Sequence, residues 1–309
     1  MISATRGRPA VKTIGASTSR RALLSFGAGT ALAVLVPTGA RAAAGIPGRM
    51  RELEREYGAR LGVFALDAGT GRAVVHRADE RFPICSVSKT LAVGAVLRDL
   101  DRDGEYLARR IRYTEDDVKT AGHIPITGTP ENIANGLTVE ELCAAAISYS
   151  DNGAMNLLLR RLGGPTAVTR FCRSLGDGIT RLDRWEPDLN SAEPGRVTDT
   201  TTPRAIGRTY AGLAVGRALE TGDRERLAGW LVANTTGDAR IRAGVPGGWT
   251  VGDKTGTGRY GTTNDVGIAW PPDRAPIALA VLSTRPEQDA EAIDPLIAKA
   301  TALAVEALT

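Results

Sequence analysis

The chain has 309 residues, 42% of them apolar and 24% charged, so it can bury a large core and is neither disordered nor collagen-like. Its two histidines, His76 and His123, are too few for a hydrolase that binds its metal through several histidines. The three cysteines, Cys85, Cys143 and Cys172, form no C-x-x-C pair, which excludes a zinc ribbon and a thioredoxin-like motif. We therefore expect no metal and no cofactor.

The net charge of +4 does not indicate a nucleic-acid-binding protein, because the positive excess is confined to the N-terminus. Residues 1–44 contain six basic residues and no acidic residue, whereas the remainder of the chain is slightly acidic. Since that remainder offers no extended basic field, we expect a small-molecule partner and no nucleic acid.

The N-terminal segment has the order typical of a bacterial export signal. A basic stretch ends in Arg20-Arg21, a mildly apolar stretch follows over residues 22–36, and Ala40-Arg41-Ala42 matches an A-x-A cleavage pattern. The apolar stretch is shorter than the ~20 residues that a membrane anchor needs. We therefore expect residues 1–42 to be a signal peptide, of the twin-arginine type, and the mature protein to be secreted or periplasmic without stable membrane association.

The mature chain begins with a predicted charged helix over residues 47–57, followed by two short strands that a turn-rich segment joins. From Ser86 to Trp230, Ala/Leu-rich helical patterns dominate. An aperiodic segment over residues 181–203 interrupts them, and a long loop inside a compact domain is usually functional. Three strands and a closing helix complete the chain. The predicted strands span 61–66, 73–76, 249–253, 265–270 and 277–283, and the further helices span 90–100, 139–148, 154–162, 205–217 and 290–308.

This order predicts an α+β fold in which both chain ends build one five-stranded antiparallel sheet, flanked by the terminal helices. Residues 43–85 and 231–309 form the sheet-containing lobe, and residues 86–230 form an all-helical lobe inserted between them. Because clefts between such units commonly hold binding sites, we expect the active site between the two lobes.

Ser86 and Lys89 are the first candidate catalytic pair. Lysine occurs only five times among the 39 basic residues, so a lysine one helical turn after a serine is informative. If Ser86 opens a buried helix, the hydroxyl and the amine lie on the same face, and the amine can activate the hydroxyl as a nucleophile. An ordinary exposed lysine at a helix start is the simpler interpretation.

Two further polar clusters lie at predicted element boundaries. Ser150-Asp151-Asn152 lies between two helices, where a hydroxyl and an amide can relay a proton and hold a substrate amide, or where the residues simply cap the second helix. Lys254-Thr255-Gly256-Thr257-Gly258 follows a predicted strand and combines fixed positive charge, hydroxyl donors and close backbone approach. A glycine-rich turn at an edge strand is the alternative interpretation.

The aperiodic segment contains a candidate general base, Glu186. It stands between Trp185 and Pro187, and partial desolvation favours a proton-accepting role, whereas a solvated loop carboxylate is the alternative. Arg184 and Asp199 are placed to form an ion pair across the neck of the segment and hold it closed.

Ser86-x-x-Lys89, Ser150-Asp151-Asn152 and Lys254-Thr255-Gly256, in this order, resemble the motif set of serine β-lactamases and penicillin-binding proteins. With Glu186-x-x-Leu189-Asn190 between the last two motifs, the chain is similar to class A β-lactamases over almost the whole mature sequence. The resemblance implies a monomeric enzyme that hydrolyses the β-lactam amide bond of penicillins and cephalosporins through a serine acyl-enzyme and so confers antibiotic resistance.

The resemblance also implies the catalytic roles. Ser86 attacks the β-lactam carbonyl, and either Lys89 or Glu186, acting through a water, takes its proton. Ser150 passes a proton to the lactam nitrogen. Glu186 and Asn190 position the water that hydrolyses the acyl-enzyme.

The binding roles are implied in the same way. Asn152 holds the side-chain amide of the substrate, and the backbone N–H groups of Ser86 and Thr257 form the oxyanion hole. The substrate carboxylate is bound by Lys254, Thr255 and Thr257, which flank Gly256 on the same segment. Many members carry an arginine on the next strand, where this chain has Thr263, so Arg240 is expected to supply the guanidinium instead.

Two alternatives remain at this point. A penicillin-binding DD-peptidase shares the three motifs but forms a long-lived acyl-enzyme, and Glu186 with Asn190 argues against it. A non-catalytic β-lactam-binding sensor usually carries a membrane span and a signalling partner, for which the mature sequence gives no indication.

Overall fold

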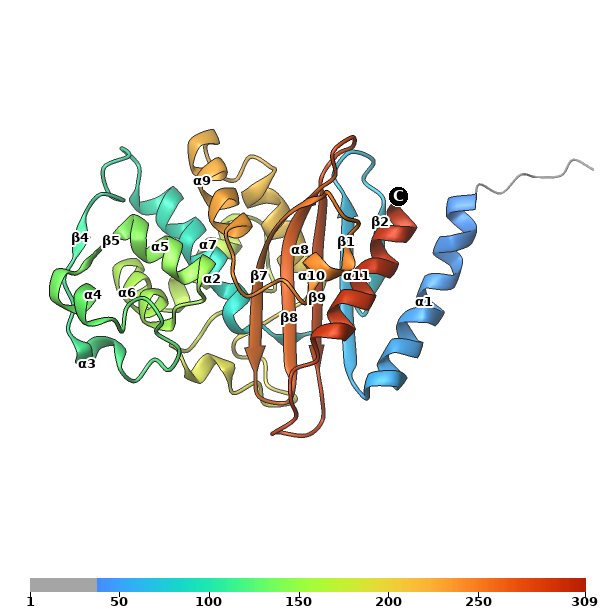
Figure 1. Ribbon diagram of the computed structural model, residues 1–309, viewed down its shortest axis with the longest axis horizontal. Helices are drawn as coiled ribbons and strands as arrows, with labels where there is room; N and C mark the ends of the chain where they lie inside the picture. The colour runs from blue at the N-terminus through green and yellow to red at the C-terminus, as the bar shows by residue number, and fades with distance from the viewer. Residues whose placement is uncertain (1–37) are drawn as a thin grey trace, which may run out of the picture. The chain divides into compact units, whose positions relative to one another are not determined.

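The computed structural model describes residues 38–309 (Figure 1). The predicted signal peptide lies outside the described residues except for its last positions, which belong to helix α1 (Thr38–Tyr57). We expected this helix to begin at Pro47, which instead lies inside it. The alanines at positions 42–44 have the highest helix propensity of any residue and favour the longer helix.

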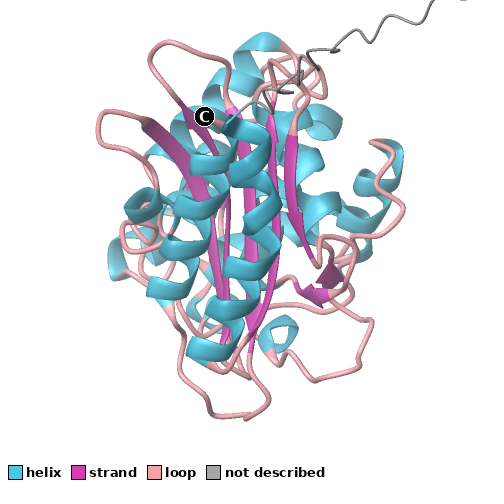
Figure 2. Ribbon diagram, turned by 90° about the vertical axis from the view of Figure 1, so that its right-hand side faces the viewer, coloured by secondary structure: helices cyan, strands magenta, loops and turns pink. Residues whose placement is uncertain are grey.

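One antiparallel sheet of five strands forms the centre of the molecule, with the order β2-β1-β9-β8-β7 (Figure 2). Strands from both chain ends therefore lie side by side, as the sequence predicted. Their bounds are β1 (Arg60–Asp67), β2 (Ala73–His76), β7 (Thr250–Gly258), β8 (Thr262–Trp270) and β9 (Ile277–Thr284).

The prediction that strand β7 ends at Asp253 was wrong. The strand continues to Gly258 because its pairing with β8 is uninterrupted from Thr250↔Trp270 to Gly258↔Thr262. Lys254-Thr255-Gly256 thus lies within an edge strand of the sheet, and its side chains take the fixed orientations of a β-strand rather than those of a turn.

Helices cover both faces of the sheet. One face packs against α1 and α11 (Asp294–Leu308), and α8 (Pro203–Ala214) packs on the opposite face at the boundary with the remaining helices. The closing helix begins four residues later than expected, and α8 ends at Ala214 rather than at Arg217. The other helices are α2 (Ser88–Ala95), α3 (Glu115–Val118), α4 (Pro130–Asn135), α5 (Val139–Ser148), α6 (Asn152–Leu162), α7 (Thr166–Ser174), α9 (Thr221–Val232) and α10 (Ile241–Gly244).

The segment over residues 86–230 contains helices, loops and three strands of two residues each, so the expected all-helical insertion is not strictly all-helical. Within it β4 (Arg110–Ile111) pairs with β5 (Leu137–Thr138), while β6 (Thr200–Thr201) pairs with β3 (Phe82–Pro83) outside it. The second pairing joins the aperiodic segment to the chain just before Ser86.

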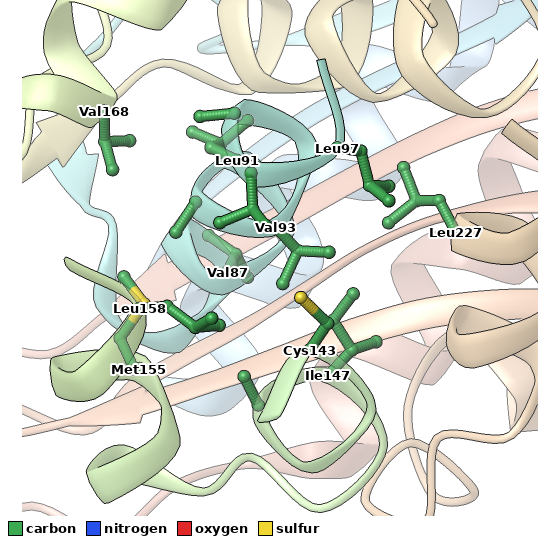
Figure 3. Close-up of a cluster of buried hydrophobic side chains, with 14 of the residues drawn as sticks. Val87, Leu91, Val93, Leu97, Cys143, Ile147, Met155, Leu158, Val168 and Leu227 are labelled. Carbon is green, nitrogen blue, oxygen red and sulfur yellow. The ribbon is translucent and has the colours of Figure 1, made fainter. Parts of the chain in front are cut away.

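Strand β9 separates two hydrophobic cores. Leu279 and Val281 pack with α1 and α11, whereas Ala280 and Leu282 face the helical side, as expected for the two-residue period of a strand. On the helical side, every residue of α2 is buried, and Leu91 and Val93 point into the apolar cluster that also contains Cys143 (Figure 3). Removing such apolar surface from water contributes about 25 cal/mol per Å². Helix α2 is therefore held rigidly.

Within residues 38–309, no helix is both long and apolar enough to cross a membrane. All three cysteines are buried and free.

Candidate active site

The structure brings Ser86 and Lys89 together at the start of the buried helix. Ser86 lies in the 3₁₀ turn Cys85–Val87, which leads directly into α2. The residue is only 8% exposed. The Nζ atom of Lys89 donates to the Oγ atom of Ser86 at 2.7 Å. A buried amine at this distance excludes the interpretation of Lys89 as an ordinary exposed lysine.

Lys89 is the centre of a buried polar cluster. Besides Ser86, its Nζ atom contacts the Oδ1 atom of Asn152 at 2.6 Å, the carbonyl oxygen of Ser150 at 3.1 Å and the Oε1 atom of Glu186 at 2.8 Å. The side chains of Lys89 and Glu186 are both fully buried. Such a pair needs compensating hydrogen bonds to offset desolvation, and the amide and carbonyl oxygens supply them.

Glu186 is a buried carboxylate and not a solvated loop residue. Its Oε1 atom lies 3.5 Å from the Oγ atom of Ser86, and its Oε2 atom accepts from the Nδ2 atom of Asn190 at 2.5 Å. The side chain of Asn156 on α6 bonds to both the N–H and the carbonyl of Glu186, each at 3.0 Å. Contacts from Lys89, Asn156 and Asn190 therefore fix the position of this carboxylate relative to Ser86.

The neck of the loop is closed by the expected ion pair. The Nε atom of Arg184 lies 2.5 Å from the Oδ2 atom of Asp199, and the other oxygen of Asp199 accepts from the N–H groups of Asp183 and Arg184. Asp199 is 1% exposed, so these donors compensate for its burial.

Ser150, Asp151 and Asn152 form the junction between α5 and α6. Asp151 caps α6 by accepting from the N–H of Ala154 at 2.8 Å, so the expectation that this cluster caps the second helix is confirmed for Asp151. Its two neighbours nevertheless reach the polar cluster. The Oγ atom of Ser150, whose φ is +55°, lies 3.4 Å from the Nζ atom of Lys89, which also contacts Asn152. Capping and participation in the site thus coexist.

Strand β7 forms the opposite wall of the site. Lys254 is fully buried, and burial, followed by the charge of Lys89, lowers the pKa of Lys254 to about 7. The hydroxyl groups of Thr255 and Thr236 are 2.5 Å apart. Thr257 is exposed and is thus available to a ligand.

The glycines of β7 permit a close approach to Ser86 and to the loop of Glu186. A Cβ atom at Gly256 would lie 3.3 Å from the backbone nitrogen of Ser86. At Gly258 it would lie 2.7 Å from the carbonyl oxygen of Asn190 and 2.8 Å from the Sγ atom of Cys85. Larger residues at these positions would push the strand away from the site.

Arg240 lies immediately before α10, and its guanidinium group reaches the outer end of β7. It donates to the Oγ1 atom of Thr257 at 2.9 Å and to the carbonyl oxygens of Gly256 and Asn264 at 3.1 and 2.8 Å. Asp294 pairs with its Nε atom at 2.7 Å. The positive charge expected near Lys254 and Thr257 is therefore present.

A cavity of about 640 Å³ lies between the loop that contains Glu186 and the end of β7. Asn190 and Gly258 belong to both the cavity and the site, and Arg259 and Tyr260 line its outer part. No group of three His, Cys, Asp or Glu side chains in the described part of the chain is arranged to hold a metal ion.

Sequence reasoning missed several residues that support the site. Asn156 follows Asn152 by one helical turn, and this second asparagine in an apolar helical pattern was a usable signal. Asn264 donates to the carbonyl of Pro83 at 2.8 Å and so holds the segment before Ser86, whereas Thr236 contacts Thr255. No local pattern distinguishes either residue, because the contacts connect distant parts of the chain.

The chain is similar to known proteins over most of its length. Residues 48–308 match the model of the beta-lactamase enzyme family. A beta-lactamase of Streptomyces lavendulae is 66% identical over 260 residues, which cover 84% of this chain and 85% of that protein. The structure of the beta-lactamase from Streptomyces albus G is 64% identical, with a TM-score of 0.82 over 84% of this chain and 97% of the other. A beta-lactamase from Desulfarculus baarsii has a TM-score of 0.83 at 46% identity, over 86% of this chain and 98% of the other.

The family match extends over most of the chain and includes the five-stranded sheet, the buried helix α2 and strand β7. These residues also contain the four motifs on which the resemblance rested. The chain belongs to the beta-lactamase enzyme family and is a class A serine β-lactamase, an enzyme that hydrolyses the amide bond of β-lactams through a serine acyl-enzyme.

Proposed function

We propose that Ser86 is the nucleophile of this hydrolysis and that the Lys89–Glu186 pair receives its proton. The observation that carries the proposal is the placement of the Ser86 Oγ atom, 2.7 Å from an amine and 3.5 Å from a carboxylate that contact one another. A serine is a weak nucleophile at neutral pH and needs a base within this range. The amine and the carboxylate contact one another directly, so both lie within reach of the transferred proton.

The oxyanion of the tetrahedral intermediate is bound by the backbone N–H groups of Ser86 and Thr257. The close approach of Gly256 to the Ser86 nitrogen supports this role, since it brings β7 beside the start of α2. One such donor is worth about 3–4 kcal/mol in the transition state.

Ser150 returns a proton to the lactam nitrogen as the ring opens. Its Oγ atom lies 3.4 Å from the Nζ atom of Lys89, from which the proton can be resupplied. Asn152, whose Nδ2 atom donates to the carbonyl of Ala121 at 2.7 Å, is fixed at the side of the cluster and binds the side-chain amide of the substrate.

The substrate carboxylate is bound at the outer end of β7. Lys254 and Arg240 supply positive charge, Thr255 and Thr257 supply hydroxyl donors, and Gly256 leaves room for the ligand. The contact of Arg240 with Thr257 supports its inclusion in this group. An arginine fork is well suited to a carboxylate.

Glu186 and Asn190 position the water that hydrolyses the acyl-enzyme. Their hydrogen bond of 2.5 Å, and the two bonds from Asn156 to the backbone of Glu186, support a fixed geometry for this step. A penicillin-binding DD-peptidase has no use for such an arrangement because its acyl-enzyme persists.

Multiple turnover tests the proposed roles together. We expect the purified protein to hydrolyse nitrocefin, a penicillin and a cephalosporin through many cycles, and Ser86→Ala to form no covalent adduct with any of them. A single stoichiometric burst by the unaltered protein would favour the peptidase instead.

The organisation of the molecule and its processing belong to the same proposal. Residues 43–85 and 231–309 form one lobe and residues 86–230 the other, with the active site between them, because Ser86 and Ser150 come from one segment and Lys254 from the other. Residues 1–42 are removed after twin-arginine export, and the mature enzyme is a secreted or periplasmic monomer. N-terminal sequencing and the mass of the secreted protein in solution test these points.

A further inference from the structure

Two carboxyl groups lie side by side beneath the carboxylate-binding end of β7. Asp253 on β7 and Asp265 on β8 are both fully buried. The register pairs Asp265 with Thr255 and Asp253 with Gly267, so the two aspartates are diagonal neighbours on the same face of the sheet. Diagonal neighbours on one face of a sheet lie close together, and both of these carboxyl groups are excluded from water.

The hydrogen-bond donors around the pair are unequally distributed. Asp253 accepts from the Nε atom of Arg242 at 2.6 Å on one oxygen and from the Nδ2 atom of Asn234 at 2.7 Å on the other. Asp265 accepts from the N–H of Ile241 at 2.9 Å on its Oδ2 atom, whereas no donor within residues 38–309 reaches its Oδ1 atom. An unpaired buried oxygen beside another carboxylate is costly unless it carries a proton.

The basic side chains near Asp253 and Asp265 are consistent with a pair of carboxyl groups that carries one negative charge. Arg242 of α10 forms an ion pair with Asp253, Arg240 is already paired with Asp294, and Lys254 lies next to Asp253 on β7. Burial and the neighbouring Asp253 raise the pKa of Asp265 well above its usual range. The ion pair of Arg242 with Asp253 and the unpartnered Oδ1 atom of Asp265 therefore favour a proton on Asp265.

The groups held by the pair directly follow Arg240 in the chain. Ile241 is bound through its backbone and Arg242 through its side chain. Gly237 lies against the pair so tightly that a Cβ atom there would be 1.9 Å from the Oδ2 atom of Asp253. The chain on both sides of Arg240 thus depends on the two carboxyl groups for its position.

We propose that Asp265 is a positioning residue for carboxylate recognition: as a neutral carboxylic acid it shares one proton with Asp253, and the pair fixes the segment that presents Arg240 to the substrate. This inference rests on the proposed role of Arg240. The proton lies between the Oδ1 atom of Asp265 and Asp253 and is not transferred during the reaction.

Infrared spectroscopy detects the shared proton without reference to activity. With ¹³C-labelled aspartate, the unaltered enzyme at neutral pH should show the C=O band of a protonated carboxyl group, and Asp265→Asn should lack it. If the difference spectrum between the unaltered enzyme and Asp265→Asn contains no such band, the proposal is wrong.

Kinetics test the positioning role. In Asp265→Asn, the amide can donate to Asp253 and accept from Ile241, so this variant should restore what Asp265→Val loses. For Asp265→Val we expect KM for benzylpenicillin to rise about tenfold, with a smaller change for the benzylpenicillin methyl ester. Equal effects of the two substitutions would show that a neutral hydrogen-bonding group at this position is not what matters.

Asp177 offers a matched control. It is also a buried carboxylate that accepts from backbone N–H groups, those of Ile179 and Thr180, but it contacts none of the site residues. Asp177→Val should lower Tm and leave KM unchanged, whereas an increase in KM equal to that of Asp265→Val would reduce the effect to general destabilisation.

The same variants distinguish a failure of the proposed Arg240 role from a failure of the positioning inference. If Arg240 does not bind the carboxylate, Arg240→Ala and Asp265→Val both leave KM unchanged while the infrared band remains. If only the positioning inference fails, Arg240→Ala raises KM and Asp265→Val does not.

Discussion

The Nζ atom of Lys89 lies 2.8 Å from the Oε1 atom of Glu186, and neither side chain has any exposed surface. The same amine donates to the Oγ atom of Ser86, so one buried ion pair faces the proposed nucleophile. Breaking such a pair by removing one partner leaves an uncompensated charge and costs about 3–5 kcal/mol, which makes each member sensitive to substitution in its own way.

Ser86→Ala should abolish hydrolysis while preserving the fold. The Oγ atom contacts only the polar cluster, and removing it creates no large cavity, because the helix that follows is packed through other residues. Nitrocefin turnover should fall to background with Tm close to that of the unaltered enzyme. Residual turnover well above background would assign the nucleophile to another residue.

Glu186→Ala should stall the reaction after acylation. The substitution removes the carboxylate that Asn190 holds at 2.5 Å, whereas it leaves in place Lys89, whose Nζ atom lies 2.7 Å from the Ser86 Oγ atom in the unaltered enzyme. We expect mass spectrometry to detect a persistent adduct of the protein with benzylpenicillin. Absence of any adduct would show that Glu186 is needed already for acylation.

Arg240→Ala should weaken carboxylate binding with less effect on the chemical step. A lost hydrogen bond to a charged group costs about 1.5–3 kcal/mol, which corresponds to roughly a tenfold to hundredfold increase in KM. The methyl ester of the same penicillin provides the control, because its binding should depend little on Arg240. Unchanged kinetics with the free acid would contradict the assignment.

Much of the fold could be predicted from local patterns. The alternation in β9, where Leu279 and Leu282 face opposite cores, and the boundaries of α5 follow from periodicity and capping residues. The end of β7 could not be predicted, because its glycines and threonines resemble a turn, and the continuous pairing with β8 that keeps them extended is non-local.

The same limit applies to the site. Ser86 and Lys89 are one helical turn apart, so their contact could be predicted from spacing. The burial of Glu186 depends on Asn156, which lies on another element, and the arrangement around Arg240 depends on Asp253 and Asp265 in two strands. Nothing near these residues in the sequence indicates which partner they contact.

Lys254 should produce an alkaline limb in the pH profile. Because burial lowers the pKa of Lys254 to about 7, its ammonium loses charge as the pH rises through that value, and kcat/KM for a penicillin should fall. A bound carboxylate favours the charged form, so kcat should decline only at higher pH. A kcat/KM profile that stays flat from neutral pH to pH of about 9 would contradict the assignment.

Lys254 should affect stability in the opposite direction: its contribution to the free energy of unfolding should rise with pH where kcat/KM falls. An unfolded lysine keeps its proton up to a pKa of about 10.4, so between that value and about 7 the unfolded state binds more protons at Lys254 than the folded state. The contribution of Lys254 to the free energy of unfolding therefore increases as the pH rises through this window. Denaturant titrations of the unaltered enzyme and of Lys254→Met should reveal it as a pH-dependent difference.

Asp199→Asn should loosen the loop that holds Glu186. The substitution weakens the ion pair with Arg184 and retains the size of the side chain, so the effect arises from charge and hydrogen bonding. We expect a loss of about 1–3 kcal/mol in the free energy of unfolding and slower deacylation, seen as a longer-lived adduct with benzylpenicillin. Arg204 and Asp79 form a more exposed ion pair, and Asp79→Asn should change neither quantity measurably. Equal effects of the two substitutions would show that the loop neck has no special role.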